Sequence, residues 1–128
     1  MRFLTFVRSS ETSAAPPPAI MEAIEKLAVE STRAGKLVQT GGLLRSGAGA
    51  KVRLSGGKVT VTDGPFTEAK EVIGGYAIFD LPSKQAAIEE TVKFMELHKK
   101  HWPGWEGETE VRQIFDAADF AQAAGRKG

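Results

Sequence analysis

Ionisable side chains gather in one short stretch of the sequence, from residue 63 to residue 71. Asp63, Glu68 and Glu71 bring carboxylates to this stretch, and Lys70 brings an ammonium group beside them. A carboxylate held next to a lysine in a partly buried groove can act as a general acid or base. The stretch therefore predicts a site in which Asp63 or Glu68 is the catalytic acid or base.

The same stretch begins with an Asp-Gly-Pro-Phe segment that ends at Phe66. Glycine tolerates unusual backbone dihedrals, proline cannot donate to a strand ladder, and aspartate bonds to its own backbone. A simple turn, with Phe66 plugging the core, explains the segment equally well. The charges that follow would then be a solvated strand edge. A turn and a ligand-contacting site both remain open at this point.

A ligand-contacting site would draw on cations and aromatic rings as well as on carboxylates. Arginine suits the binding of an anionic group, and Arg45 and Arg53 precede the turn in the sequence. The predicted ligand contacts are Arg45, Arg53, Phe66, Lys70, Glu71 and Tyr76. For such a site we expect Glu68→Gln to abolish binding with little effect on stability, and Asp63→Ala to lower stability.

The composition limits what kind of protein this is. The chain has 128 residues, with 17 basic and 16 acidic side chains and no cysteine. This length predicts one domain over residues 1–128, with a tail at 116–128. The balanced charge predicts no direct contact with nucleic acid, and the lack of cysteine excludes disulfides and thiolate chemistry. With no apolar run long enough for a signal peptide or a membrane span, we expect a cytoplasmic protein.

Hydrophobic periodicity predicts strands and helices in alternation. A helix with an apolar face ends at Gly35, and Ser83 is the expected N-cap of a second helix. The expected strands cover residues 3–7, 36–40, 72–81 and 109–115, with a hairpin at 51–62. Without the hairpin, the order is βαββαβ. This order predicts an α+β fold of the ferredoxin-like type with an inserted β-hairpin.

The register of the hairpin can be predicted from its turn. Gly56-Gly57 is typical of a two-residue turn between antiparallel strands. This turn pairs Leu54 with Val59 and, farther along, Val52 with Val61, all on one face. We expect that face to be buried and the lysine-bearing face to be solvated.

The strands predict a homodimer. Residues 3–7 and 72–81 carry apolar side chains on both faces, whereas two crossover helices cover only one face of a sheet. A second copy that packs sheet to sheet would bury the other face. The alternative is that the hairpin and the C-terminal tail fold over that face in one chain.

Two further clusters invite a chemical interpretation. His98 and His101 have a spacing that can place two imidazoles on one metal, but no third ligand is evident. We therefore predict no bound metal and no other cofactor. Trp102 and Trp105 flank a Pro-Gly break, where indoles plug the core edge or line a pocket. The glycine-rich segment 42–47 fails as a phosphate loop, because Ala48 stands where lysine is needed.

The Asp-Gly-Pro-Phe segment, read with its surroundings, resembles the DGPF group of YCII-related proteins. The resemblance rests on Thr62 to Glu71, on Gly35, on the Gly41-Gly42-Leu43 segment, on Lys51-Val52-Arg53 before Ser55-Gly56-Gly57, on Glu110-Val111-Arg112, and on Phe115-Asp116 with Asp119-Phe120. It implies a bacterial protein with the dimeric α/β barrel type of fold.

The resemblance says less about activity than about fold. Wider family members have a histidine on the first helix, paired with an aspartate. Ala23-Ile24 occupies that region here, so this catalytic pair does not carry over. Some DGPF-type proteins occur alongside extracytoplasmic-function sigma factors. Two hypotheses follow: a homodimer that binds a small polar molecule beside the central turn, with carboxylate acid–base chemistry, or a non-catalytic regulatory or interaction module linked to sigma-factor regulation.

Overall fold

The computed structural model describes residues 1–11, 15–66 and 71–115. Glu68 and Lys70 of the predicted site, and the tail at 116–128, lie outside these residues. The described elements follow one another as β1 (Arg2–Ser9), α1 (Pro18–Arg33), β2 (Leu37–Gly42), the 3₁₀ helix η1 (Ser46–Ala48), β3 (Ala50–Ser55), β4 (Lys58–Asp63), β5 (Val72–Asp80), α2 (Lys84–His101) and β6 (Gly107–Gln113).

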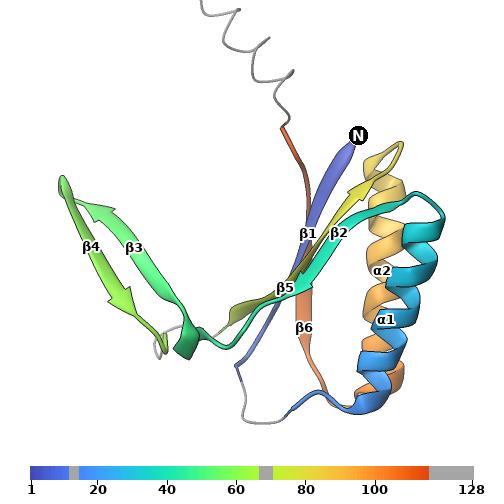
Figure 1. Cartoon of the computed structure of the whole chain (residues 1–128), viewed down its shortest axis with the longest axis horizontal. Helices are drawn as coiled ribbons and strands as arrows, with labels where there is room; N and C mark the ends of the chain where they lie inside the picture. Colours follow the sequence, from blue (N-terminus) through green and yellow to red (C-terminus); the bar gives the residue numbers. More distant parts are fainter. Residues whose placement is uncertain (12–14, 67–70, 116–128) are drawn as a thin grey trace, which may run out of the picture.

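Four of the strands form one antiparallel sheet in the order β2-β5-β1-β6. Both helices lie on one face of this sheet (Figure 1). The hairpin β3–β4 is inserted between β2 and β5 and forms a separate two-stranded sheet. This is the βαββαβ arrangement with an inserted hairpin, so the predicted ferredoxin-like α+β fold is confirmed. The outer strands start or end about two residues from their predicted limits.

The helix ends form where the local sequence predicts them. Pro18 occupies the first turn of α1, where the N–H that proline lacks has no helical partner. Gly35 follows the helix with φ of 73°, a left-handed conformation that glycine adopts without strain. At the start of α2, the Ser83 hydroxyl accepts a hydrogen bond of 3.1 Å from the backbone N–H of Ala86.

The core lies between the sheet and the helices. Phe3 of β1 forms a buried cluster with Leu81 and Ala87. Phe79 of β5, which is directly opposite Phe3 in the sheet, packs against this cluster. Since side chains alternate along a strand, the intervening residues point to the face without helices. We call that second surface the open face; it carries Leu4 and Phe6 of β1 and Tyr76 and Ile78 of β5, all half-buried.

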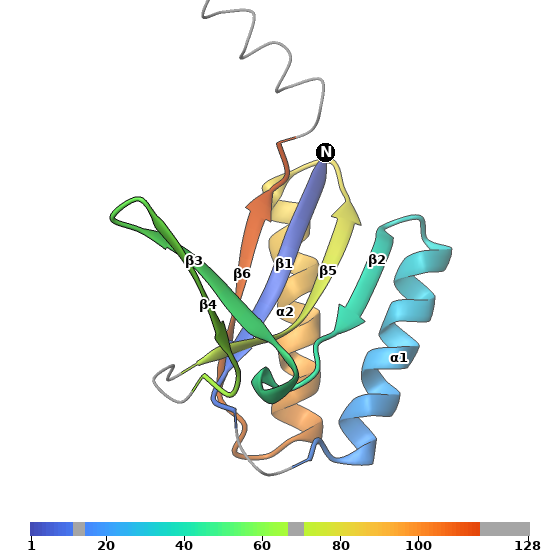
Figure 2. The ribbon, with the colours of Figure 1, turned by 60° about the vertical axis from the view of Figure 1, so that its left-hand side comes forward.

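The hairpin projects from the open-face side of the sheet (Figures 1 and 2). Its register is as predicted: Leu54 pairs with Val59, Val52 pairs with Val61, and Gly56 and Gly57 form the turn. The prediction that these side chains are buried is wrong for the single chain, because they are 62–72% exposed. The chain leaves the sheet after β2 and returns only at β5, so no described element covers the hairpin.

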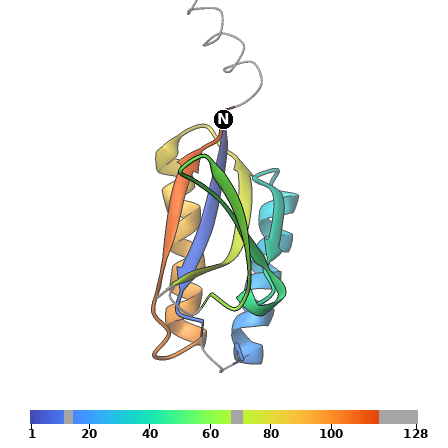
Figure 3. The ribbon, with the colours of Figure 1, turned by 90° about the vertical axis from the view of Figure 1, so that its left-hand side faces the viewer.

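We call this projecting hairpin the arm, and its four apolar side chains (Val52, Leu54, Val59 and Val61) the arm stripe. Viewed toward the open face, the arm passes in front of the four-stranded sheet (Figure 3). Every residue of β3 and β4 is exposed. The open face and the arm stripe are therefore two apolar surfaces that the described chain leaves uncovered.

Candidate functional site

The base of the arm is held together by the Asp-Gly-Pro-Phe segment. The backbone N–H of Gly64, which follows β4, donates to the carbonyl oxygen of Gly49, which precedes β3, over 2.8 Å. A Cβ atom at position 64 would lie 1.6 Å from the carbonyl oxygen of Ser46, so only glycine fits there. The two ends of the arm are thus fixed to each other and to η1.

Phe66 continues the same network. Its backbone N–H donates to the Ser46 hydroxyl oxygen over 3.2 Å. Its half-buried ring lies against Gly49, and the Lys51 ammonium group sits 4.4 Å from the ring centroid, a cation–π distance. Phe66 therefore packs at the root of the arm, and Lys51 is a contact that sequence reasoning did not foresee.

Glu11 joins the arm base to the end of β1. Its carboxylate accepts a hydrogen bond of 2.7 Å from the backbone N–H of Ser46, and Arg45 Nε lies 3.6 Å away. The Ser46 hydroxyl first, then the Ser46 amide and the Arg45 charge, hold the pKa of Glu11 below its usual value. The sequence carried no signal for this contact, because Glu11 and Ser46 are 35 positions apart.

The structure brings together only part of the predicted site. Phe66 and Arg45 belong to the arm base, whereas Arg53 is an exposed residue in the middle of β3. Asp63 ends β4 opposite Ala50 and is also exposed. Among the described residues, the Asp63 carboxylate has no hydrogen-bond partner, so main-chain groups rather than this carboxylate anchor the turn. Glu71 is exposed just before β5.

Tyr76 lies apart from the arm, on the open face. Its hydroxyl oxygen accepts a hydrogen bond of 2.8 Å from Gln39 Nε2 on the neighbouring strand β2. The ring lies against Gly41, where a Cβ atom would come within 3.0 Å of it. Glycine at position 41 thus leaves the space that lets the phenol cross β2. Since the hydroxyl accepts from Gln39, its own proton is available to a ligand.

A charged group borders the apolar centre of the open face on the other side. Arg8 donates to Glu110 over 3.0 Å, and the Arg112 Nε atom lies 3.6 Å from the other oxygen of the same carboxylate. The Arg8 guanidinium also stands 4.9 Å from the ring centroid of Phe6. The open face therefore combines apolar side chains with a phenol, an amide and an arginine–glutamate pair. Sequence reasoning found Tyr76 in this group but missed Gln39, Arg8 and Glu110.

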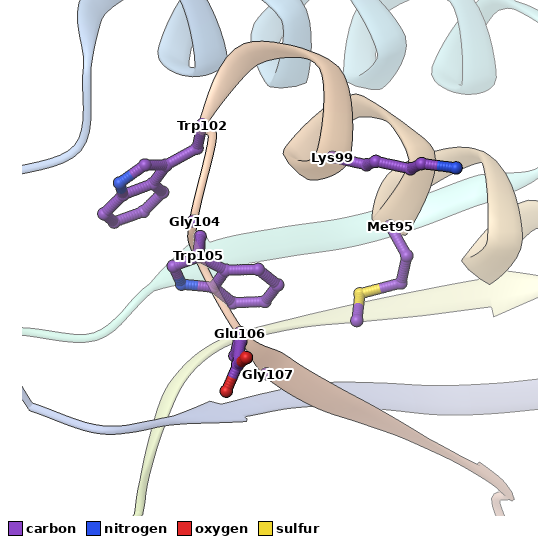
Figure 4. Close-up of a pocket in the computed structure, with 7 residues that line it drawn as sticks. All are labelled: Met95, Lys99, Trp102, Gly104, Trp105, Glu106 and Gly107. Carbon is purple, nitrogen blue, oxygen red and sulfur yellow. The ribbon is translucent and has the colours of Figure 1, made fainter.

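Two shallow cavities lie elsewhere on the molecule. One, of about 320 Å³, lies at the end of α2 and is lined by Met95, Lys99, Trp102, Gly104, Trp105, Glu106 and Gly107 (Figure 4). The other, of about 530 Å³, runs between α1 and α2. Neither includes a residue of the Asp-Gly-Pro-Phe segment.

The tryptophan pair both plugs the core edge and lines a cavity, so the two interpretations of it coexist. Trp105 packs on buried His98 with ring centroids 4.4 Å apart and lies over Gly107, where a Cβ atom would be 2.3 Å from the indole. The Nδ1–H of His98 donates to the carbonyl oxygen of Phe94 over 2.9 Å. Within residues 1–11, 15–66 and 71–115, no three metal-ligating side chains gather in one place.

Burial lowers the pKa of His98, and the hydrogen bond to Phe94 offsets part of that effect. The ring is thereby kept neutral and packed between aromatic side chains, a structural role. His101, one turn farther, lines the other cavity instead. The two histidines are therefore not arranged around a common ligand.

One family model matches most of the chain. The model of the YCII-related domain matches residues 1–94 of the 128 in the chain. The chain belongs to the YCII-related family. The matched part runs from β1 into α2 and includes the arm, its base and Tyr76.

One curated relative of this YCII-related protein is described only as an uncharacterised protein. It is the "Uncharacterized protein R00369" of Rhizobium meliloti (strain 1021), 36% identical over 69 residues. The match covers 54% of this chain and 53% of that protein, so the chain spans about half of the relative's length. Neither α1 nor α2, the described helices, combines the length and apolar character needed to cross a membrane.

Proposed function

We propose that this YCII-related protein is a cytoplasmic homodimer of the DGPF group that binds a small polar molecule between the open face and the base of the arm. One observation carries the proposal: the open face presents an apolar centre with an oriented phenol and a charged pair at its borders. Ligand sites have this composition, since apolar walls supply area and a few placed polar groups supply orientation.

The polar groups define what the molecule must offer. Tyr76 accepts from Gln39 and donates its proton outward, so the ligand needs an acceptor oxygen or nitrogen there. Arg8 and Arg112 both contact the carboxylate of Glu110, and a guanidinium group suits an anionic group of the ligand. Leu4, Phe6 and Ile78 supply the apolar floor.

The dimer supplies the enclosure that one chain lacks. Asp63 and Glu71 are exposed and Tyr76 is half-buried, so the described residues of one chain do not enclose them. Packing the open face against a second copy would remove its apolar side chains from water, at about 1.5–3 kcal/mol for each one fully buried. In that enclosure Asp63 or Glu68 would be the acid or base.

A thermal-shift screen against small carboxylates, phosphates and amides tests the proposal. A ligand at about one hundred times its dissociation constant adds about 2.7 kcal/mol to stability. Tyr76→Phe should abolish that gain, because it removes only the hydroxyl that meets the ligand. Thr60→Val, which removes an exposed hydroxyl from the arm, should preserve it. If Tyr76→Phe bound the ligand as tightly as the parent, the open face would not be the ligand site.

The second hypothesis is a non-catalytic interaction module linked to sigma-factor regulation. The observation in its favour is that Asp63, Pro65 and Glu71 are exposed while the backbone N–H groups of Gly64 and Phe66 fasten the arm. A purified extracytoplasmic-function sigma factor from the same genome is the appropriate probe. Its binding, together with no response to the small-molecule screen, would favour this module over the ligand-binding dimer.

A further inference from the structure

We propose that the arm of one copy packs its stripe on the open face of a second copy, so that each ligand site is lined by both chains. This inference rests on the proposed homodimer and adds where its arms lie. The contact is reciprocal: the arm stripe of each copy meets the open face of the other, so the same two patches meet twice.

The two surfaces match in chemistry. The arm stripe presents four aliphatic side chains that are 62–72% exposed. The open face presents Leu4, Phe6 and Ile78 around Tyr76. Two sheets pack through such faces, with apolar side chains interdigitating across about 10 Å. An isolated two-stranded hairpin is only marginally stable in water, so packing against a sheet would stabilise the arm.

The charged side chains of the arm are placed so that the contact buries few of them. Lys51, Arg53 and Lys58 lie on the face of the arm opposite the stripe, so they stay in water when the stripe packs on a sheet. On the stripe face, Asp63 lies at the base of the arm, opposite Ala50.

The arm also has the length to cover a sheet. Each of its strands has six residues, which at a rise of about 3.3 Å gives roughly 20 Å. Four strands spaced about 4.8 Å apart span roughly 14 Å between the outer backbones. One arm can therefore cross the whole open face of a neighbouring copy.

The base of the arm opposes closure onto its own sheet. The hydrogen bonds of Gly64 to Gly49 and of Phe66 to Ser46 hold the ends of the arm, and Glu11 fixes Ser46 to the end of β1. This base holds the arm away from the sheet of its own chain (Figure 1). A second copy can reach both surfaces without breaking any of these bonds.

Engineered cysteines test the arrangement cleanly, because the chain has none of its own. Leu54→Cys on the arm stripe and Ile78→Cys on the open face are made in separate chains, mixed and oxidised. We expect a disulfide-linked dimer from the mixture and from neither chain alone. Arg53→Cys, on the opposite face of the arm, should not link to Ile78→Cys and is the matched control.

Combining Leu54→Cys and Ile78→Cys in one chain distinguishes the alternatives. We expect linked dimers; an internally linked monomer would show that the arm closes on its own sheet and would overturn the inference. Self-linking of Leu54→Cys alone would overturn it too, because the arms would then meet each other. Leu4→Cys replaces Ile78→Cys if that variant does not fold.

Sedimentation separates failure of this inference from failure of the homodimer. A parent chain that sediments as a monomer at micromolar concentration refutes the dimer itself. A dimeric parent that forms no Leu54→Cys to Ile78→Cys link refutes only the placement of the arm. With the arm placed as inferred, Leu54→Asp with Val59→Asp should weaken dimerisation at least about a hundredfold. Thr60→Asp, on the polar face, should have little effect.

Discussion

The backbone N–H of Phe66 donates a hydrogen bond to the hydroxyl oxygen of Ser46 over 3.2 Å. This bond joins the Asp-Gly-Pro-Phe segment to the small-residue turn η1 and, through Ser46, to Glu11. The segment thereby fastens the arm with main-chain groups and leaves its acidic side chain exposed. The backbone of a motif whose side chains suggest proton transfer thus holds the base of the arm in place.

Gly64→Ala should loosen the arm. The added Cβ atom would lie 1.6 Å from the Ser46 carbonyl oxygen, so the backbone must move apart there. Forcing extra volume into a close contact costs about 1–3 kcal/mol. We expect a lower melting temperature and faster proteolytic cleavage within the arm. Gly47→Ala, where an added Cβ meets nothing within 4 Å, should behave like the parent.

Gly41→Ala should disturb the Tyr76–Gln39 pair. The new methyl group would come within 3.0 Å of the phenol ring, which must shift and lengthen its hydrogen bond to Gln39. We expect the free energy of unfolding to fall by about 1 kcal/mol, the usual net contribution of one hydrogen bond. Since Tyr76 is the one tyrosine of the chain, its ring resonances report the shift directly. Unchanged resonances would contradict this contact, and Gly42→Ala is the control.

Stability should fall on mild acidification because of His98. Burial lowers the pKa of this ring in the folded chain, so below about pH 6.5 the unfolded chain binds the proton more readily. The free energy of unfolding should therefore decrease as the pH falls from 7.5 to 5.5, as measured by urea denaturation. His98→Asn keeps a donor for the Phe94 carbonyl but cannot titrate, so its stability should vary less with pH. His101→Asn should retain the parent's dependence.

Glu90→Gln should destabilise the fold by about 1.5–3 kcal/mol at neutral pH, the range for hydrogen bonds to charged groups. Glu90 is buried and accepts hydrogen bonds from Lys36 and Lys93 over 3.0 and 3.2 Å. Burial acts to raise the pKa of Glu90, but the two lysines outweigh burial and lower it.

The effect of Glu90→Gln should depend on pH. A carboxylate whose pKa is lowered by folding stabilises the fold at pH values above its ordinary pKa. That stabilisation is lost as the pH falls toward the lowered pKa. The difference between parent and Glu90→Gln should thus shrink below about pH 4. Exposed Glu89→Gln should stay within about 0.5 kcal/mol of the parent throughout. A constant difference across the pH range would contradict an ionised Glu90.

The sequence alone determined the features that depend on near neighbours. The two faces of β5, the left-handed Gly35, the Ser83 cap and the register of the arm all follow from periods of two or four residues or from a tight turn. The ferredoxin-like order follows in turn, because short connections leave few ways to arrange such elements.

Only the tertiary structure decided where the arm goes and which side chains meet. Glu11 reaches Ser46, Gln39 reaches Tyr76 and Arg8 reaches Glu110 across 35, 37 and 102 positions. Those pairings depend on strand order and loop path, which no local pattern encodes. The alternation in β3 and β4 correctly predicts one apolar face. Whether that face is buried depends on what lies across from it, and within the described chain nothing does.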